Sequence, residues 1–151
     1  MLRLSRPVLI LTTFVALGAG LALARTITSH TKLLSSAEIG AAGRLDCTQK
    51  PATRTKLARS LLRLTMSRLP RSTPLHLFVV TPGTPFDPAV VEPLPAAASS
   101  DRKGRAHFVW DTRNGGTLPL GLSLAELGGR TFEVRDAANR PLLIGPFPQV
   151  Q

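Results

Sequence analysis

The sequence predicts an α+β fold that is mainly β. A small antiparallel β-sheet or sandwich of four to five strands over residues 75–146 is expected to be covered by one amphipathic helix over residues 54–69. Apolar and polar residues alternate in two late segments, as in strands with one buried face. Residues 54–69 instead gather apolar residues on one helical arc. A hydrophobic content of 43% argues against wholesale disorder, while 13 prolines and 12 glycines imply many turns.

The chain begins with an apolar run over residues 8–24. Arg3 and Arg6 precede the run, and it ends in Ala22-Leu23-Ala24, which is the order of a secretory signal with a small-residue cleavage site. The run has 17 residues, whereas a helix that crosses a bilayer core needs roughly 20. We therefore expect residues 1–24 to be a signal peptide, with a short membrane anchor over residues 8–24 as the alternative. The expected location is periplasmic or secreted, or anchored to the membrane.

The net charge of +10 is unevenly distributed. Residues 25–71 contain ten Lys or Arg and two acidic residues, whereas residues 72–151 contain seven of each. Residues 25–53 are rich in Ser, Thr, Ala and Gly and show no sustained periodicity, so we expect a basic flexible linker there. A basic arm of this kind favours anionic partners such as lipid head groups, envelope polymers or nucleic acid.

The helix over residues 54–69 is predicted from Leu57, Leu61 and Leu64, which share one apolar arc, and it should end at Pro70. One interpretation is a basic amphipathic helix that lies on an anionic membrane or polymer. The other is an ordinary helix that packs on a sheet and exposes its basic residues to water. The candidate contacts with an anionic surface are Lys56, Arg59, Arg63, Arg68 and Arg71.

The remaining segments predict a domain over residues 54–151. Residues 74–81 form an apolar run that indicates a strand buried on both faces. The proline-rich residues 82–104 predict a surface loop, with at most a short edge strand at residues 89–91. Alternation predicts further strands at residues 105–111, 130–136 and 141–145, the last two as a hairpin. The expected core is Leu57, Leu61, Leu64, Leu77, Val79, Phe108, Trp110, Phe132, Val134, Leu142 and Ile144.

No pattern in the chain predicts a catalytic, cofactor or metal site. Ser123 lies in a sequence similar to a nucleophile elbow, but the second glycine of that motif is missing. Ser123 and Glu126 have the spacing of a helix-capping box, which we predict instead. The three histidines are scattered, and Cys47 is the single cysteine, so no intramolecular disulfide can form.

Residues 104–145 loosely resemble the short β-domains of exported bacterial proteins. We expect an exported, non-enzymatic binding or scaffolding module of the bacterial envelope or secreted fraction, whose basic arm contacts an anionic membrane or polymer. An exported enzyme or inhibitor that uses the proline-rich loop is the first alternative. The second is an intracellular nucleic-acid binder, which is disfavoured because the aromatic residues lie outside the basic region, so that cations and stacking rings are not interleaved.

Overall fold

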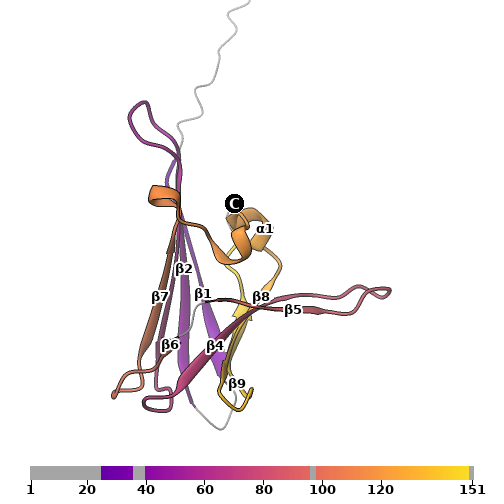
Figure 1. Cartoon of the computed structure of the whole chain (residues 1–151). Helices are drawn as coiled ribbons and strands as arrows, with labels where there is room; N and C mark the ends of the chain where they lie inside the picture. Colours follow the sequence, from indigo (N-terminus) through magenta and orange to yellow (C-terminus); the bar gives the residue numbers. More distant parts are fainter. Residues whose placement is uncertain (1–24, 36–39, 96–97, 150–151) are drawn as a thin grey trace, which may run out of the picture.

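The chain folds into one large, curled antiparallel sheet, seen in a computed structural model that describes residues 25–35, 40–95 and 98–149 (Figure 1). Half of the described residues are in strands and 8% are in helices. The strands are β1 (Ile27–Ser35), β2 (Ala42–Lys50), β3 (Arg59–Ser67), β4 (Pro74–Thr81), β5 (Val90–Pro93), β6 (Ala98–Ser99), β7 (Ala106–Asp111), β8 (Thr131–Asp136) and β9 (Pro141–Pro146). The predicted sheet of four to five strands under a helix is therefore wrong.

The strands follow the order β5-β4-β8-β9-β1-β2-β3-β7, and β6 pairs with β4. Two halves can be distinguished along this order. In the first half, β1, β2, β3 and β7 pair along most of their lengths. In the second half, β4 and β8 pair in the same way, and β9 continues from β8. Among the described residues, strand pairing joins the halves where Leu34 and Ser35 of β1 pair with Ile144 and Leu143 of β9.

Two glycines allow the sheet to bend at this junction. A Cβ on Gly145 would lie 2.8 Å from Leu33 Cδ2, and one on Gly43 would lie 2.9 Å from Leu143 Cδ1. Both distances are shorter than real Cβ contacts, so a larger residue at either position would force the side chain of Leu33 or Leu143 to move. The halves can therefore approach each other and enclose a core between their inner faces.

The predicted helix over residues 54–69 is wrong, because most of that segment is β3. Leu62, Leu64 and Met66 are buried and point to the inner face, while Arg63 and Thr65 between them are exposed. The leucines of this segment fit both the period of a helix and the period of two of a strand. Pairing decides between them, since β3 hydrogen-bonds to β2 on one side and to β7 on the other.

The segment expected to be a flexible linker, residues 25–53, contains β1 and β2. Their inner faces carry few large apolar side chains, among them Leu33 and Leu45, so the alternation was weak in the sequence. Both strands are stabilised by pairing with neighbouring strands along most of their length, rather than by many apolar side chains of their own.

The later strands were predicted well. β7, β8 and β9 lie within a residue of the expected bounds, and β8 and β9 form the expected hairpin. β4 has the expected bounds, but it is buried on one face only, because Leu75, Leu77 and Val79 point inward while His76 is exposed. The edge strand expected at residues 89–91 is β5, which begins one residue later and ends two residues later.

The core lies between the two halves and includes a chain of aromatic rings. The ring of Phe132 contacts the rings of Trp110 and Phe147, at centroid distances of 6.1 and 5.5 Å, and Phe108 stacks on Trp110. Six predicted core residues are fully buried: Leu64, Leu77, Val79, Phe132, Val134 and Leu142. Phe108 and Trp110 are partly buried against the core, and Leu61 is half-buried. Leu57 and Ile144, which are 92% and 43% exposed, were predicted wrongly.

A short helix, α1 (Leu124–Leu127), packs between the halves at one end of the sheet (Figure 1). Its Leu124 and Leu127 are buried. Ser123 forms the predicted capping box, because its hydroxyl accepts from the Glu126 N–H and the Glu126 carboxylate accepts from the Ser123 N–H. The prediction of a helix cap is thus confirmed.

The segment predicted to be a signal or anchor, residues 1–24, lies outside the described residues. Within the described part of the chain, no helix is long and apolar enough to cross a bilayer.

Cys47 lies on the inner face of β2 and is 1% exposed. Burial raises the pKa of its thiol, which keeps the thiol protonated and unreactive in the folded protein.

Candidate functional site, a basic hollow at one end of the sheet

A hollow of about 770 Å³ lies at the end of the first half of the sheet where β1 begins. The loop between β2 and β3, residues 51–58, forms one side of it, and the turn η1 (Arg113–Gly115) after β7 forms another. Thr26, just before β1, completes the lining. All the charged residues that line the hollow are basic: Lys50, Lys56, Arg59 and Arg113.

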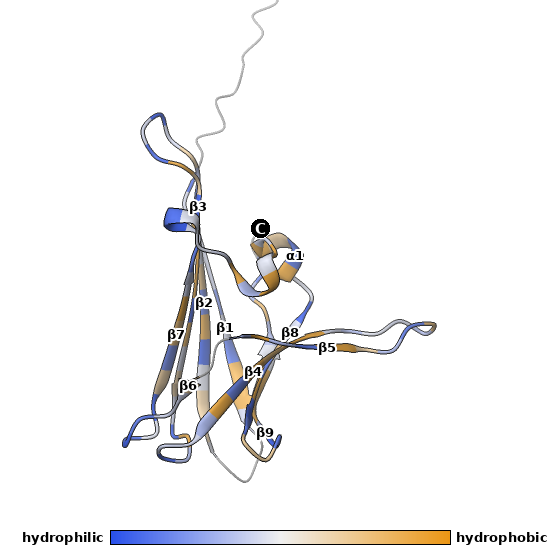
Figure 2. Cartoon of the chain, viewed as in Figure 1, coloured by the Kyte–Doolittle hydropathy of each residue, from blue (hydrophilic) through white to orange (hydrophobic). Residues whose placement is uncertain are grey.

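The β2–β3 loop is held in shape by Thr53. The Thr53 N–H donates to the Lys56 carbonyl at 2.8 Å, and the Thr53 hydroxyl accepts from the Lys56 N–H at 3.1 Å. These bonds fold the loop so that Leu57 is 92% exposed beside the basic residues. Figure 2 shows this loop, at the upper left, as mainly hydrophilic with a short hydrophobic stretch. A large apolar side chain in an exposed loop, between basic residues, suits contact with an anionic bilayer.

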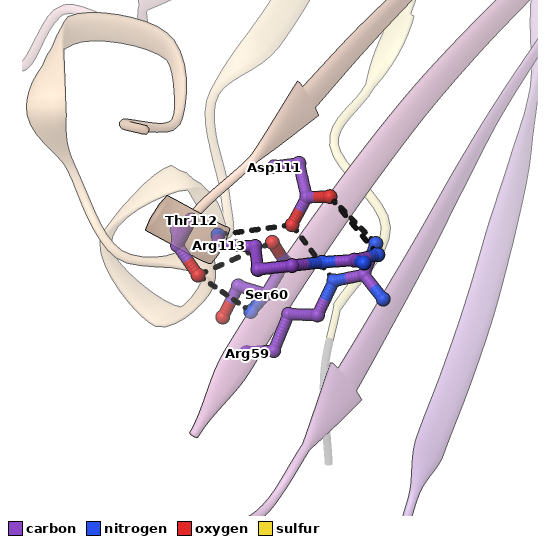
Figure 3. A network of polar contacts seen from close by, with 5 residues as sticks. All are labelled: Arg59, Ser60, Asp111, Thr112 and Arg113. Carbon is purple, nitrogen blue, oxygen red and sulfur yellow. Dashed lines mark hydrogen bonds and ion pairs between the residues drawn. The ribbon is translucent and has the colours of Figure 1, made fainter. Parts of the chain in front are cut away.

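An ion pair links strands β3 and β7 beside the hollow (Figure 3). The Arg59 guanidinium donates to both carboxylate oxygens of Asp111, at 2.7 and 2.5 Å. Asp111 also accepts from the Arg113 N–H at 3.0 Å. Next to it, the Thr112 N–H donates to the Ser60 carbonyl, and the Thr112 hydroxyl accepts from the Ser60 N–H. This Arg59–Asp111 clamp fixes the position of the η1 turn relative to the β2–β3 loop.

The hydrogen bonds from Arg59 and from the Arg113 backbone lower the pKa of Asp111 to about 2. An unfolded aspartate titrates near pH 3.9. A carboxylate whose pKa is lower in the folded state stabilises the fold fully above its unfolded pKa and loses that contribution as the pH falls through its folded pKa. The clamp should therefore stabilise the protein above about pH 4 and lose this effect towards pH 2.

Replacing Asp111 with Asn should flatten the pH dependence of the unfolding free energy between about pH 4 and pH 2. Urea denaturation of both proteins at several pH values in this range measures the effect. Asp101 and Asp136, whose pKa values are also lowered, should keep part of the wild-type slope in the variant. Identical slopes for the two proteins would show that the clamp does not form.

The structure separates the five residues predicted to contact an anionic surface. Lys56 and Arg59 line the hollow. Arg63 lies in the middle of β3 on the outer face, opposite Asp46 of β2. Arg68 and Arg71 are exposed in the turn between β3 and β4, at the far end of β3.

The far end of the sheet carries its own basic group. The turn with Arg68 and Arg71 contacts the loop before β7 through backbone bonds from Leu69 to Gly104 and from Ser72 to Asp101. That loop adds three more basic residues to this end: Arg102, Lys103 and Arg105. Among the described residues, no large apolar side chain in these two turns at the far end is exposed.

Sequence reasoning missed Lys50 and Arg113 as members of the site. They join Lys56 and Arg59 because β2, β3 and β7 are neighbours in the sheet. The predicted helix at residues 54–69 gave no reason to place these four residues together. A strand there would have placed the start of β3 beside the end of β7.

The proline-rich residues 82–104, predicted to be a loop, contain the short strands β5 and β6, and β5 forms a projecting hairpin with β4 (Figure 1). Figure 2 shows β5 as hydrophobic, and Phe86 in the connecting turn is 94% exposed. Glu92 pairs with Arg130 at 3.5 Å, and the Asp87 backbone closes a turn with Thr84. In the described residues, no group of three or more His, Cys, Asp or Glu side chains could hold a metal.

In comparisons with known proteins, no family model, curated protein or solved structure matched this chain.

Proposed function

We propose that the protein is an exported, non-enzymatic binding module of the bacterial envelope or secreted fraction, and that the basic hollow is the part that contacts an anionic membrane surface. The main observation behind the proposal is that four basic side chains line one hollow and that an exposed Leu57 lies beside them. Asp111 pairs with Arg59 at 2.5 Å and with Arg113 at 3.7 Å, so Lys50 and Lys56 supply most of the free positive charge.

The position of the hollow adds support. The described chain begins at Arg25, next to Thr26 in the lining, so the expected signal or anchor over residues 1–24 joins the domain at this end. If residues 8–24 stay in the membrane, the hollow lies close to the lipid head groups. If they are removed, the same basic surface remains with Arg25 added to it.

A lipid surface fits the site better than nucleic acid does. Single-stranded nucleic acid binds where basic residues alternate with exposed aromatic rings. Here Phe108, Trp110, Phe132 and Phe147 pack in or against the core, away from the basic lining. Leu57 offers an aliphatic side chain, which can enter the acyl boundary of a bilayer.

Adsorption to lipid vesicles tests the proposal. The protein should sediment with vesicles of phosphatidylglycerol and phosphatidylcholine at about 0.05 M salt, and should be released at about 0.5 M salt, where exposed charges are strongly screened. Vesicles of phosphatidylcholine alone are the control. Equal binding to both vesicle types would contradict the proposal, as would binding that salt does not weaken.

A further inference from the structure

Strand β7 is an open edge of the sheet. Among the described strands only β3 pairs with it, and none of them pairs with its other side. β7 is six residues long and contains neither proline nor lysine, the residues that commonly protect an edge strand. Its outward side chains include Val109, which is 50% exposed. An edge of this kind can accept a further strand.

The backbone groups that point away from β3 can be identified. The Thr112 N–H donates to the Ser60 carbonyl at 3.0 Å, so Thr112 uses its backbone towards β3. In an antiparallel ladder, successive residues direct their backbone groups to alternate sides. Phe108 and Trp110 therefore bond towards β3, whereas His107 and Val109 direct an N–H and a C=O each to the open side.

At both ends of this open stretch, other parts of the chain already cover the backbone of β7. Before it, the Arg105 N–H donates to the Asp101 carboxylate at 2.8 Å, and the Arg105 carbonyl accepts from the Asp101 N–H at 2.7 Å. After it, Gly116 lies so near the Asp111 carbonyl that a Cβ on Gly116 would sit 2.1 Å from that oxygen. The free edge is thus centred on residues 107–109 and offers two donors and two acceptors.

We propose that two copies of this chain associate by antiparallel pairing of β7, with Phe108 opposite Phe108 of the second copy. In this register His107 of each copy faces Val109 of the other. Each such pair exchanges two backbone hydrogen bonds, since these are the residues whose groups point outward. All the free groups of the stretch on both copies are then satisfied by four bonds.

The side chains fit the same register. The pairing stops before Arg105 and Asp111, whose charges are already paired within each copy with Asp101 and Arg59. Ala106 lies opposite Trp110, which places a small residue against a large one. Phe108 and Trp110, which are only partly buried in one copy, gain cover from the second. This self-complementarity favours a second copy over a strand of another protein.

Replacing Val109 with Pro tests the pairing, because it removes an edge donor without touching a bond to β3. Val109→Thr, which keeps the N–H, is the matched control. Sedimentation equilibrium of the protein, in the mature form that an expressing bacterium makes, should show a dimer. The dissociation constant should rise at least about tenfold in V109P, through loss of two hydrogen bonds, and stay within about threefold in V109T. A wild-type protein that is monomeric at all concentrations would overturn the proposal, as would a dimer that V109P leaves unchanged.

Cross-linking tests the register and does not depend on V109P folding. The predicted pair of residues 107 and 109 has a Cα separation of about 5.5 Å, within the range of a disulfide. Mixed H107C and V109C proteins should therefore oxidise to a covalent dimer faster than either variant alone. The wild type, whose only thiol is the buried Cys47, is the control. Equal rates for the mixture and the single variants would contradict this register.

Discussion

Replacing Phe132 with alanine should lower the free energy of unfolding by about 3–5 kcal/mol. Phe132 has no exposed surface, and its ring contacts both Trp110 and Phe147 where the two halves of the sheet face each other. The loss includes the transfer of the ring and the cavity that it leaves. A small domain has about 5–15 kcal/mol of stability in total, so the variant should be close to unfolding.

Phe86→Ala is the matched control for this prediction. It removes the same side chain from a position that is 94% exposed, so the expected change is below about 0.5 kcal/mol. Chemical denaturation followed by circular dichroism measures both variants. If the two variants lost similar amounts of stability, the two halves of the sheet would not enclose a core at Phe132.

Replacing both Lys50 and Lys56 with alanine should weaken adsorption to anionic vesicles by roughly 30-fold. Each basic residue near an anionic bilayer contributes about 1 kcal/mol, and about 1.4 kcal/mol corresponds to a factor of ten. Both lysines line the hollow, and neither is engaged in an ion pair among the described residues. The effect should disappear at high salt, where both proteins are released.

The matched control removes the same charge from the far end of the sheet. Arg68→Asn with Arg71→Ala is suitable because Arg68 has a φ of 58°, a conformation that Asn tolerates better than Ala. This variant should bind within about threefold of the wild type. A larger loss from the Arg68 and Arg71 pair than from the Lys50 and Lys56 pair would place the contact at the far end instead.

Much of the second half of the sheet could be predicted from the sequence. Residues 131–136 and 141–146 combine alternation with a turn, so local signals were sufficient for β8 and β9. β1, β2 and β3 could not be predicted in this way. β1 and β2 carry few large apolar residues, and the leucines of β3 fit a helix equally well until the pairing with β2 and β7 is known.

The candidate site was predicted in part, for the same reason. Lys56 and Arg59 are close in sequence and belong to the hollow. Lys50 and Arg113 join them through strand order, and Arg68 and Arg71 are removed from them by the length of an extended strand, about 3.3 Å per residue. The expected basic arm is also not a detachable segment, since β1, β2 and β3 are part of the sheet. Deleting residues 25–71 would therefore destroy the fold, and point variants are the appropriate test.

The measurement that tests the proposed site most directly is an NMR titration of the folded domain with phosphatidylglycerol micelles or small vesicles. We expect the amide signals from residues 50–59 and 113–115 to shift or broaden first, and to recover on addition of salt. Signals from residues 68–72 and 101–105 should change little. Perturbation confined to the far-end turns, or to the β4–β5 hairpin, would contradict the assignment of the basic hollow as the contact site.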